Sequence, residues 1–198
     1  MDLFGYFKYL PVLETERLIL RKMTLGDAEA MFSYSCDPEV ARHVLWSAYS
    51  DISEARNYLR YVLRSYRQDK PTSWAMELKE TGRMIGTCGF MWVNEEHRSA
   101  EVGYSMSREY WNRGLMTEAL SAVLKEGFEN MGLHRIEAQH EVDNPASGRV
   151  MEKCGMRCEG TLRGRLYNKG RYVDVNLWAI LLEEYLNLGR VRRRGGEI

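Results

Sequence analysis

Apolar and polar residues alternate along the chain with two different periods, and each change of period marks the boundary of a predicted element. Arg17–Arg21 alternates as a short strand, whereas Thr24 begins a helix that ends near Cys36. Over residues 51–70 apolar residues recur at intervals of three or four, which predicts a second helix with one buried face. The same two periods predict strands at 73–78, 84–93 and 100–106, a helix at 114–131, a strand at 135–140, a helix at 144–155, and strands at 158–167 and 172–181.

The predicted order of elements is β-α-α-β-β-β-α-β-α-β-β, with helices mixed among strands that mostly follow one another directly. This order is typical of an α+β (mixed α/β) domain, and no internal repeat or linker divides it. We take residues 13–185 as a single domain, residues 1–12 as an N-terminal extension, and residues 186–198 as a basic C-terminal tail that we expect to be mobile. Apolar residues alternate over 173–179, so an edge strand there could pair with a second copy and form a homodimer.

Composition narrows the class of protein. The chain has 198 residues, of which 44% are hydrophobic, and 28 Lys and Arg residues balance 28 Asp and Glu residues. This size and hydrophobicity predict one soluble domain, and the balanced charge argues against a general nucleic-acid binder, which needs a basic excess. No run of 18 apolar residues is present, and residues 1–11 lack the apolar core of a signal peptide. We therefore expect no membrane segment and a cytoplasmic location.

The zero net charge hides a local asymmetry. Residues 186–198 carry four arginines and one glutamate, which leaves a mildly acidic body. We interpret this tail as a solvated end, and contact with anionic nucleic acid or with a partner is the alternative. The four cysteines form no CxxC pair and the four histidines have no convincing ligand spacing, so we expect reduced thiols and no metal.

The segment Arg108–Thr117 separates the strand that ends at Met106 from the helix that follows Gly114. A strand, a short polar turn with a glycine and a helix N-terminus together present unpaired backbone N–H groups at the positive end of the helix dipole. Such a site suits a phosphate or pyrophosphate, although neither GxxxxGK[ST] nor GxGxxG occurs in the chain. A plain turn, in which Gly114 serves only chain geometry, explains the segment equally well.

Four motifs, in this order and spacing, resemble the GNAT superfamily of acetyl-CoA-dependent N-acetyltransferases: Glu101–Met106, Tyr110–Ala119, Asn144–Ser147 and Lys153–Met156. The resemblance covers roughly residues 13–182. The opening Leu13–Arg21 segment and the residues around Asn144 are most similar to the branch of ribosomal-protein-alanine (N-terminal) acetyltransferases. The resemblance to the superfamily implies a GNAT-like acyl-CoA N-acyltransferase fold. In this fold a mostly antiparallel sheet splays at the cofactor cleft, and helices flank the sheet. The resemblance also implies acetyl-CoA as cosubstrate.

The phosphate loop of the superfamily reads Gln/Arg-x-x-Gly-x-Gly/Ala and falls here on residues 111–116, where Gly114 matches and Trp111 and Met116 depart. The resemblance places the pantetheine arm in the gap beside residues 102–106, where Gly103 would permit the bulge that splaying needs. The cofactor-binding residues that it implies are Val102, Gly103, Tyr104, Met106, Trp111, Asn112, Arg113, Gly114, Leu115, Met116, Thr117, Asn144, Ser147 and Lys153.

Acetyl transfer to an amine needs a proton acceptor, polarisation of the thioester carbonyl and a proton for the leaving thiolate. The resemblance offers Glu101 as general base, directly or through water, backbone N–H groups near Gly103 and Tyr104 for the carbonyl, and Ser147 as acid. Each also has a structural explanation: Glu101 as a solvent-facing strand residue, Asn144 as a helix N-cap, Ser147 as an ordinary residue of the first turn.

The sequence says least about which amine accepts the acetyl group. The branch resemblance favours a protein N-terminal α-amine, and the alternatives are a small amine such as a polyamine, amino acid or antibiotic, or a non-catalytic acyl-CoA-binding module. Residues 44–53, 91–98 and 167–171 are the expected acceptor region and carry no motif that chooses among these. Six aromatic residues either wall an acceptor pocket or belong to the core: Trp46, Tyr49, Trp92, Tyr104, Tyr110 and Tyr167.

Overall fold

The structure is a computed structural model that describes residues 3 and 5–194, with side chains as far as residue 188. In this part of the chain eight strands form one sheet in the order β1-β2-β3-β4-β5-β6-β8-β7. The strands are β1 (Leu13–Glu14), β2 (Leu18–Arg21), β3 (Ser73–Leu78), β4 (Arg83–Asn94), β5 (Ser99–Met106), β6 (Arg135–Glu141), β7 (Arg157–Asn168) and β8 (Arg171–Leu181). Neighbouring strands are antiparallel except β5 and β6, which are parallel. The predicted mixed, mostly antiparallel sheet is therefore confirmed.

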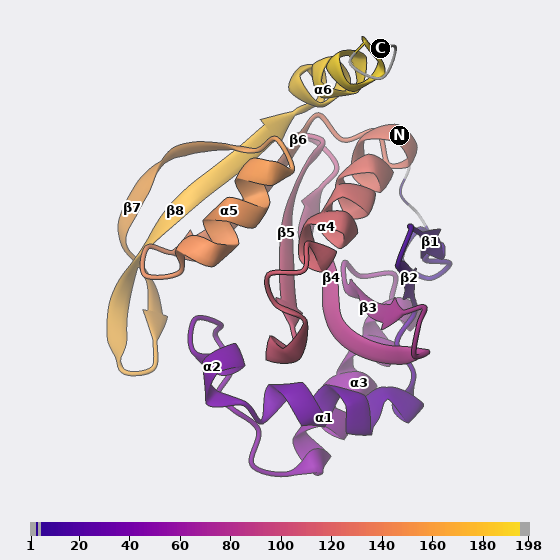
Figure 1. The fold of residues 1–198 in the computed structure, drawn as a ribbon, viewed down its shortest axis with the longest axis vertical. Coiled ribbons are helices and arrows are strands. Elements are labelled where there is room, and N and C mark those ends of the chain that lie inside the picture. Colours follow the sequence, from indigo (N-terminus) through magenta and orange to yellow (C-terminus); the bar gives the residue numbers. More distant parts are fainter. Residues whose placement is uncertain (1–2, 4, 195–198) are drawn as a thin grey trace.

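Helices cover both faces of this sheet (Figure 1). They are α1 (Ala28–Ser35), α2 (Pro38–Ala41), α3 (Ile52–Arg67), α4 (Leu115–Lys125), α5 (Pro145–Lys153) and α6 (Leu182–Arg194). Consecutive strand residues point to opposite faces, and on β5 the Tyr104 hydroxyl reaches α5 while Ser105 hydrogen-bonds Tyr34 of α1. The layer of α1 and α3 and the layer of α4 and α5 thus lie on opposite faces.

Strands β5 and β6 stay together for three residue pairs, from Ser99 opposite Arg135 to Glu101 opposite Glu137. Beyond this point β5 remains paired with β4 as far as Met106, whereas β6 remains paired with β8, so the two parallel strands separate. The sheet therefore splays at Glu101, as the family resemblance implies.

The predicted bulge at Gly103 is wrong. The register shift lies on the neighbouring strand, between Phe90 and Trp92, where Met91 is the extra residue of β4. A Cβ at Gly103 would lie 2.8 Å from the sulfur of Met91. The glycine therefore makes room for the side chain of the bulged residue and does not form the bulge itself.

Described residues at both ends of the chain pack against the expected domain. Leu3, Phe7 and Leu10 are buried in the core, and the indole N–H of Trp74 donates to the carbonyl of Pro11 at 2.7 Å. The described residues 3 and 5–11 therefore contact the domain through these side chains and this carbonyl.

At the other end, α6 continues the chain past residue 185 as far as Arg194. Its Tyr185 ring stacks on Phe128 with centroids 4.9 Å apart, and its hydroxyl donates to Glu129 at 2.6 Å. The basic tail is thus helical where it is described, and residues 195–198 lie outside the described residues. Its mobility stays a prediction.

Local sequence signals locate most helix starts. Thr24 with Asp27, and Asp51 with Glu54, form the capping boxes at the starts of a 3-10 turn (Leu25–Asp27) and of α3. The predicted helix at 114–131 is α4 followed by a π-helical turn at Glu126–Asn130. Strand β1 and helix α2 were not predicted, because two and four residues are too few to show a period.

Candidate active site

The predicted phosphate loop is a tight turn between β5 and α4. A 3-10 turn at Arg108–Tyr110 is followed by Asn112 and Gly114, whose φ angles are 60° and 77°. Gly114 is the N-cap of α4, and no side chain caps the helix. The first N–H groups of α4 therefore have no partner within the helix, and they lie at its positive end. The local backbone is that of an anion site.

The two departures from the loop pattern do not fill this site. Met116 is buried at 6% exposure and Leu115 at 3%, so both side chains are in the core and only their backbone borders the turn. The indole N–H of Trp111 donates to the carbonyl of Met106 at 2.9 Å, which closes the turn onto the end of β5. The guanidinium of Arg113 lies 5.4 Å from the ring centre of Tyr110, so the loop carries one positive charge.

Hydrogen bonds and an ion pair that the sequence did not reveal connect the loop to the turn between β1 and β2. Arg17 donates to the carbonyl of Arg113 at 2.9 Å and forms an ion pair with Glu118 of α4 at 2.7 Å. The Thr15 hydroxyl donates to the same carboxylate at 2.6 Å. Burial alone would raise the pKa of Glu118, but these bonds lower it on balance, so the carboxylate stays charged. The turn between β1 and β2 thereby fixes the loop.

Glu101 lies where β5 and β6 part, and both of its carboxylate oxygens are held. Oε2 accepts from the indole N–H of Trp92 at 2.7 Å, and Oε1 accepts from the side-chain amide of Gln139 at 2.9 Å. Gln139 lies on β6 two residues beyond the last backbone pair, so its side chain bridges the strands after their ladder ends. Sequence reasoning missed Gln139, and no local signal marks it.

Tyr104, Ser147 and Asn144 come together on the other face of β5. The Tyr104 hydroxyl lies 2.8 Å from the Ser147 hydroxyl and donates to the Ser147 carbonyl at 3.1 Å. Asn144 is the N-cap of α5, as predicted, and its side-chain oxygen accepts from the Ser147 N–H at 3.4 Å. Burial raises the pKa of the Tyr104 hydroxyl, so it keeps its proton throughout the neutral range.

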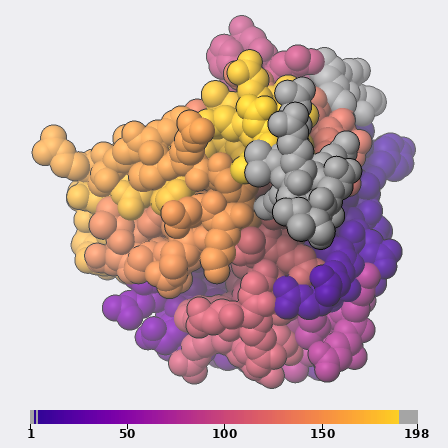
Figure 2. Space-filling model, turned by 45° about the horizontal axis from the view of Figure 1, so that its top comes forward, coloured from indigo at the N-terminus to yellow at the C-terminus, as the bar shows by residue number. Residues whose placement is uncertain are grey.

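Glu101 and Tyr104 therefore point to opposite faces of one strand, with Gly103 between them. A reacting carbonyl beside Gly103 would have a carboxylate on one side and a hydroxyl pair on the other. The loop and α5 lie on one face of the molecule (Figure 2). The structure thus brings together Tyr104, Asn144 and Ser147 at the start of α5, and at the other end of that helix the Cys154 thiol donates to the carbonyl of Thr117 on α4 at 3.5 Å. The side chain of Lys153, on the last turn of α5, forms no ion pair with the described residues.

The six aromatic residues take part in different contacts. Tyr110 is 9% exposed and belongs to the core, and Tyr104 and Trp92 take part in the contacts above. Trp46 packs on Tyr49 with ring centres 5.4 Å apart, and Tyr167, 63% exposed, packs on Tyr172 at 5.1 Å. The described residues hold no group of three or more His, Cys, Asp and Glu side chains that could bind a metal.

A polar cluster joins three segments at the far end of β6. The carboxylate of Glu141 lies 2.9 Å from His43 Nδ1 and accepts from the side-chain amide of Asn168, and Lys169 donates to the carbonyl of Val44. The segment that follows α2 is thereby tied to the tip of the β7–β8 hairpin, and α2 lies beside that tip in Figure 1. We call this the Glu141 cluster.

Replacing Glu141 by Gln should lower the free energy of unfolding at pH 7 by about 1–3 kcal/mol, because the side chain is 5% exposed and its donors lose a charged acceptor. Burial alone would raise the pKa of Glu141, but the bonds from His43 and Asn168 lower it on balance. A carboxyl whose folded pKa lies below its unfolded value, about 4.3, stabilises the fold above that pH and loses this contribution as pH falls.

The measurement is urea unfolding at pH 7 and pH 3.5. The difference between E141Q and the native chain should shrink at the lower pH. E14Q removes the exposed ion pair of Glu14 with Lys79 and should change the free energy of unfolding far less than E141Q does. An equal loss at both pH values would show that the charge of Glu141 contributes nothing.

The family described as "Acetyltransferase (GNAT) domain" matches residues 17–157, which contain the loop, Glu101 and the whole of α5. The chain belongs to the GNAT acetyltransferase family. As a GNAT enzyme it is an acetyl-CoA-dependent acyltransferase. Among the residues that the structure describes, this acetyltransferase has no helix long and apolar enough to cross a membrane.

Similar proteins cover nearly the whole domain. An uncharacterized N-acetyltransferase, p20 of Bacillus licheniformis, is 35% identical over 176 residues, which is 89% of this chain and 99% of the relative. The crystal structure of a GNAT acetyltransferase from Bacillus anthracis has a TM-score of 0.79 and 31% identity, and the match covers 87% of this chain and 99% of that one.

Two other relatives of this GNAT chain have named acceptors. The spermidine N(1)-acetyltransferase of Vibrio cholerae is 33% identical over 171 residues, covering 86% of this chain and 96% of the relative. The ribosomal-protein-serine acetyltransferase of Escherichia coli is 29% identical over 100 residues, covering 50% of this chain and 56% of the relative. The resemblance to ribosomal-protein acetyltransferases thus has support, but the acceptors of the two relatives differ.

Proposed function

We propose that this GNAT enzyme acetylates a primary amine that carries a single positive charge at the site, the N-terminal α-amine of a protein. The observation that carries the proposal is the state of three glutamates on one face of β5 and β6. Glu137 pairs with Arg135 at 2.6 Å and Glu141 pairs with His43, whereas Glu101 has no cationic partner among the described residues. One carboxylate without a cationic partner suits one ammonium group, whereas a polyamine carries several ammonium groups.

The chain's residues fit the cosubstrate. The uncapped N-terminus of α4 and Arg113 would hold the pyrophosphate, and the unpaired edge of β5 over 102–106 would pair with the amides of the pantetheine arm. Two hydrogen bonds link Asn144 to that edge. Its side-chain oxygen accepts from the Ser147 N–H, and the Ser147 hydroxyl bonds the hydroxyl of Tyr104 on β5. Acetyl-CoA supplies the thioester, whose carbonyl carbon is the electrophile.

The side chains of the site then divide the proton transfers. Glu101, directly or through a water, accepts a proton from the ammonium, and the free amine attacks the carbonyl carbon. Backbone N–H groups near Gly103 and Tyr104 stabilise the oxyanion. As the new C–N bond forms, the nitrogen releases its second proton to water, and as the C–S bond breaks, Ser147 gives its proton to the thiolate. Tyr104, whose hydroxyl lies 2.8 Å from that of Ser147, passes a proton to Ser147 and regains one from water, and Glu101 releases the first proton to solvent. The products are the amide and CoA.

The test is the release of free CoA, titrated with a thiol reagent, in the presence of acetyl-CoA and a panel of acceptors. Peptides with a free α-amine should be turned over with a kcat/KM at least about tenfold above that of spermidine. Lysine-free versions of these peptides whose N-terminus is blocked by formylation should release no CoA. Turnover of spermidine alone would refute the protein acceptor.

A small cationic amine is the second candidate, and one observation favours it. The Vibrio cholerae spermidine N(1)-acetyltransferase matches 86% of this chain at 33% identity, which is more of the chain than the ribosomal-protein-serine acetyltransferase matches. The acceptor panel separates the two functions, because each acceptor is assayed by itself. In a mixed assay spermidine and the peptides should also compete, since both would need the carboxylate of Glu101.

Gln139 should position the base. Replacing it by Ala removes one of the two donors to Glu101, so we expect kcat to fall about tenfold while the KM for acetyl-CoA stays within about twofold. In the E101Q background Q139A should cost no further activity, because Gln139 would act only through the carboxylate that E101Q already lacks. Q68A, which changes the chain's other glutamine, should leave kcat and KM unchanged. A further loss of activity in E101Q/Q139A would show a merely structural role for Gln139.

A further inference from the structure

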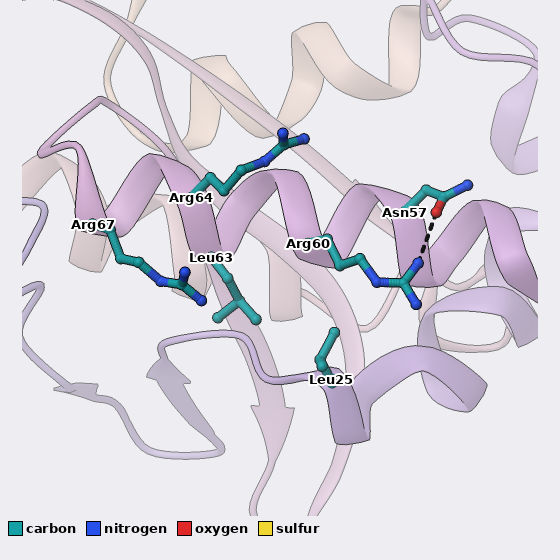
Figure 3. A pocket seen from close by; sticks show the side chains of 6 residues that line it. All are labelled: Leu25, Asn57, Arg60, Leu63, Arg64 and Arg67. Atoms are coloured by element: carbon teal, nitrogen blue, oxygen red, sulfur yellow. Dashed lines mark hydrogen bonds between the residues drawn. The ribbon is translucent and has the colours of Figure 1, made fainter.

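The outer surface of α3 carries a groove that the proposed chemistry does not use. It has a volume of about 480 Å³ and is lined by Leu25, Asn57, Arg60, Leu63, Arg64 and Arg67. Figure 3 shows Arg60, Leu63 and Arg67 on the edge of α3 that faces Leu25, while Arg64 extends from the other edge of the helix. We call this the α3 groove. None of its residues contacts the phosphate loop or Glu101.

The described residues offer no ion-pair partner to the arginines of the groove. The helix contains four arginines against one glutamate, and Arg56, Arg60, Arg64 and Arg67 recur at successive turns, all exposed. Within the described part of the chain none of them forms an ion pair, and Arg60 donates to the neutral side chain of Asn57 at 2.8 Å. Like charges four residues apart destabilise a helix, so this spacing does not serve the stability of α3.

The floor between these arginines is apolar. Leu25, on the 3-10 turn after β2, is 50% exposed, and Leu63 is partly buried against the core. A nucleic-acid backbone needs the guanidinium groups and gains nothing from a leucine floor. A peptide with carboxylates on either side of an apolar residue would use both features, because guanidinium groups bind carboxylates through two parallel bonds.

We propose that the α3 groove docks an acidic segment of the protein acceptor, with an apolar side chain of that segment on Leu25 and Leu63. The proposal rests on the proposed function for the identity of the partner. It is supported by the position of the groove, since α3 packs with α1 on the face of the sheet toward which Glu101 points. A protein held on α3 would thus have its free amine on the acceptor side of β5.

Binding can be measured without turnover. We would follow fluorescence anisotropy of a labelled peptide in which Asp and Glu residues flank one leucine, titrated with the whole protein at low salt. Saturable binding that weakens as salt rises is expected. The charge-reversed variant R60E/R64E should bind at least about tenfold more weakly. Replacing the leucine of the peptide by serine, or Leu25 by serine, should weaken binding up to about tenfold.

Matched controls define the outcomes that overturn the proposal. R163E/R165E changes two exposed arginines of β7 and should leave binding unchanged. Equal weakening by both charge-reversed pairs would show attraction to overall charge, tighter binding of an RNA oligonucleotide would show a nucleic-acid surface, and no binding of the peptide would refute docking.

A kinetic arm separates this proposal from the proposed function. An N-terminal acceptor peptide is assayed alone and joined to the acidic segment by a flexible spacer. The native enzyme should show a KM about tenfold lower for the joined peptide with kcat unchanged, and R60E/R64E should lose this gain while acetylating the short peptide normally. If the acidic peptide binds but no N-terminal peptide is acetylated, the proposed acceptor is refuted and the α3 groove remains a peptide-binding site. If the joined peptide has the same KM as the short one, docking of the acceptor is refuted.

Discussion

Replacing Glu101 by Gln should lower kcat by about 10²- to 10⁴-fold, the range that a positioned general base contributes, and leave the Kd of acetyl-CoA within about twofold. Gln has the same shape and its carbonyl can still accept from Trp92, so the packing where β5 and β6 part is preserved. What is lost is the carboxylate that, as we propose, takes the proton of the ammonium. Thiol release measures kcat, and calorimetric titration measures the Kd.

Glu137 offers a matched control for this substitution. It is the register partner of Glu101 on β6 and points to the same face, but Arg135 already neutralises it. E137Q should therefore lower kcat by less than about threefold. If E101Q retained the native rate, Glu101 would have no role in proton transfer, and if both variants lost activity alike, the effect would be one of sheet structure.

Replacing Gly114 by Pro should weaken acetyl-CoA binding by at least about tenfold and leave little turnover at ordinary acetyl-CoA concentrations. The φ angle of Gly114 is +77°, whereas a proline ring fixes φ near −65°, so the turn before α4 cannot keep its shape. The substitution also removes one N–H from the positive end of the helix. Calorimetric titration with CoA measures the loss.

Gly82 is the control for the backbone cost. It has φ of +64° in the turn between β3 and β4, and no atom lies within 4 Å of a Cβ built on it. G82P and G114P should both destabilise the protein, as urea unfolding would show, but only the second should lose CoA affinity. Native affinity in a folded G114P would mean that the phosphate site lies elsewhere.

The sequence was most informative where the signal is local. The capping boxes at Thr24 and Asp51, the Asn144–Pro145 start of α5 and the turn at Gly114 all need a few neighbouring residues, and the structure has them where they were predicted. The splayed sheet followed from the family resemblance, because four motifs in a fixed order carry information about pairing that no single segment holds.

Three contacts that hold the site and its surroundings, and that the sequence did not reveal, join residues distant along the chain. Glu101 and Gln139 are 38 residues apart, His43 and Glu141 are 98, and Arg17 and Glu118 are 101. None lies within one element, so neither periodicity nor spacing relates them. The misplaced bulge has the same origin, since Gly103 reports crowding from Met91 on another strand.

The separation of β5 from β6 gives the sheet an interior edge. If pantetheine completes that edge, as we propose, the ligand takes the place of a strand, and the fold and the cosubstrate become thermodynamically linked. Acetyl-CoA at about 100 times its Kd would add about 2.7 kcal/mol to the stability of the domain. Amides over residues 102–106 would then exchange their hydrogens more slowly as acetyl-CoA rises. The lifetime of the protein in the cell would follow the supply of its own acetyl donor.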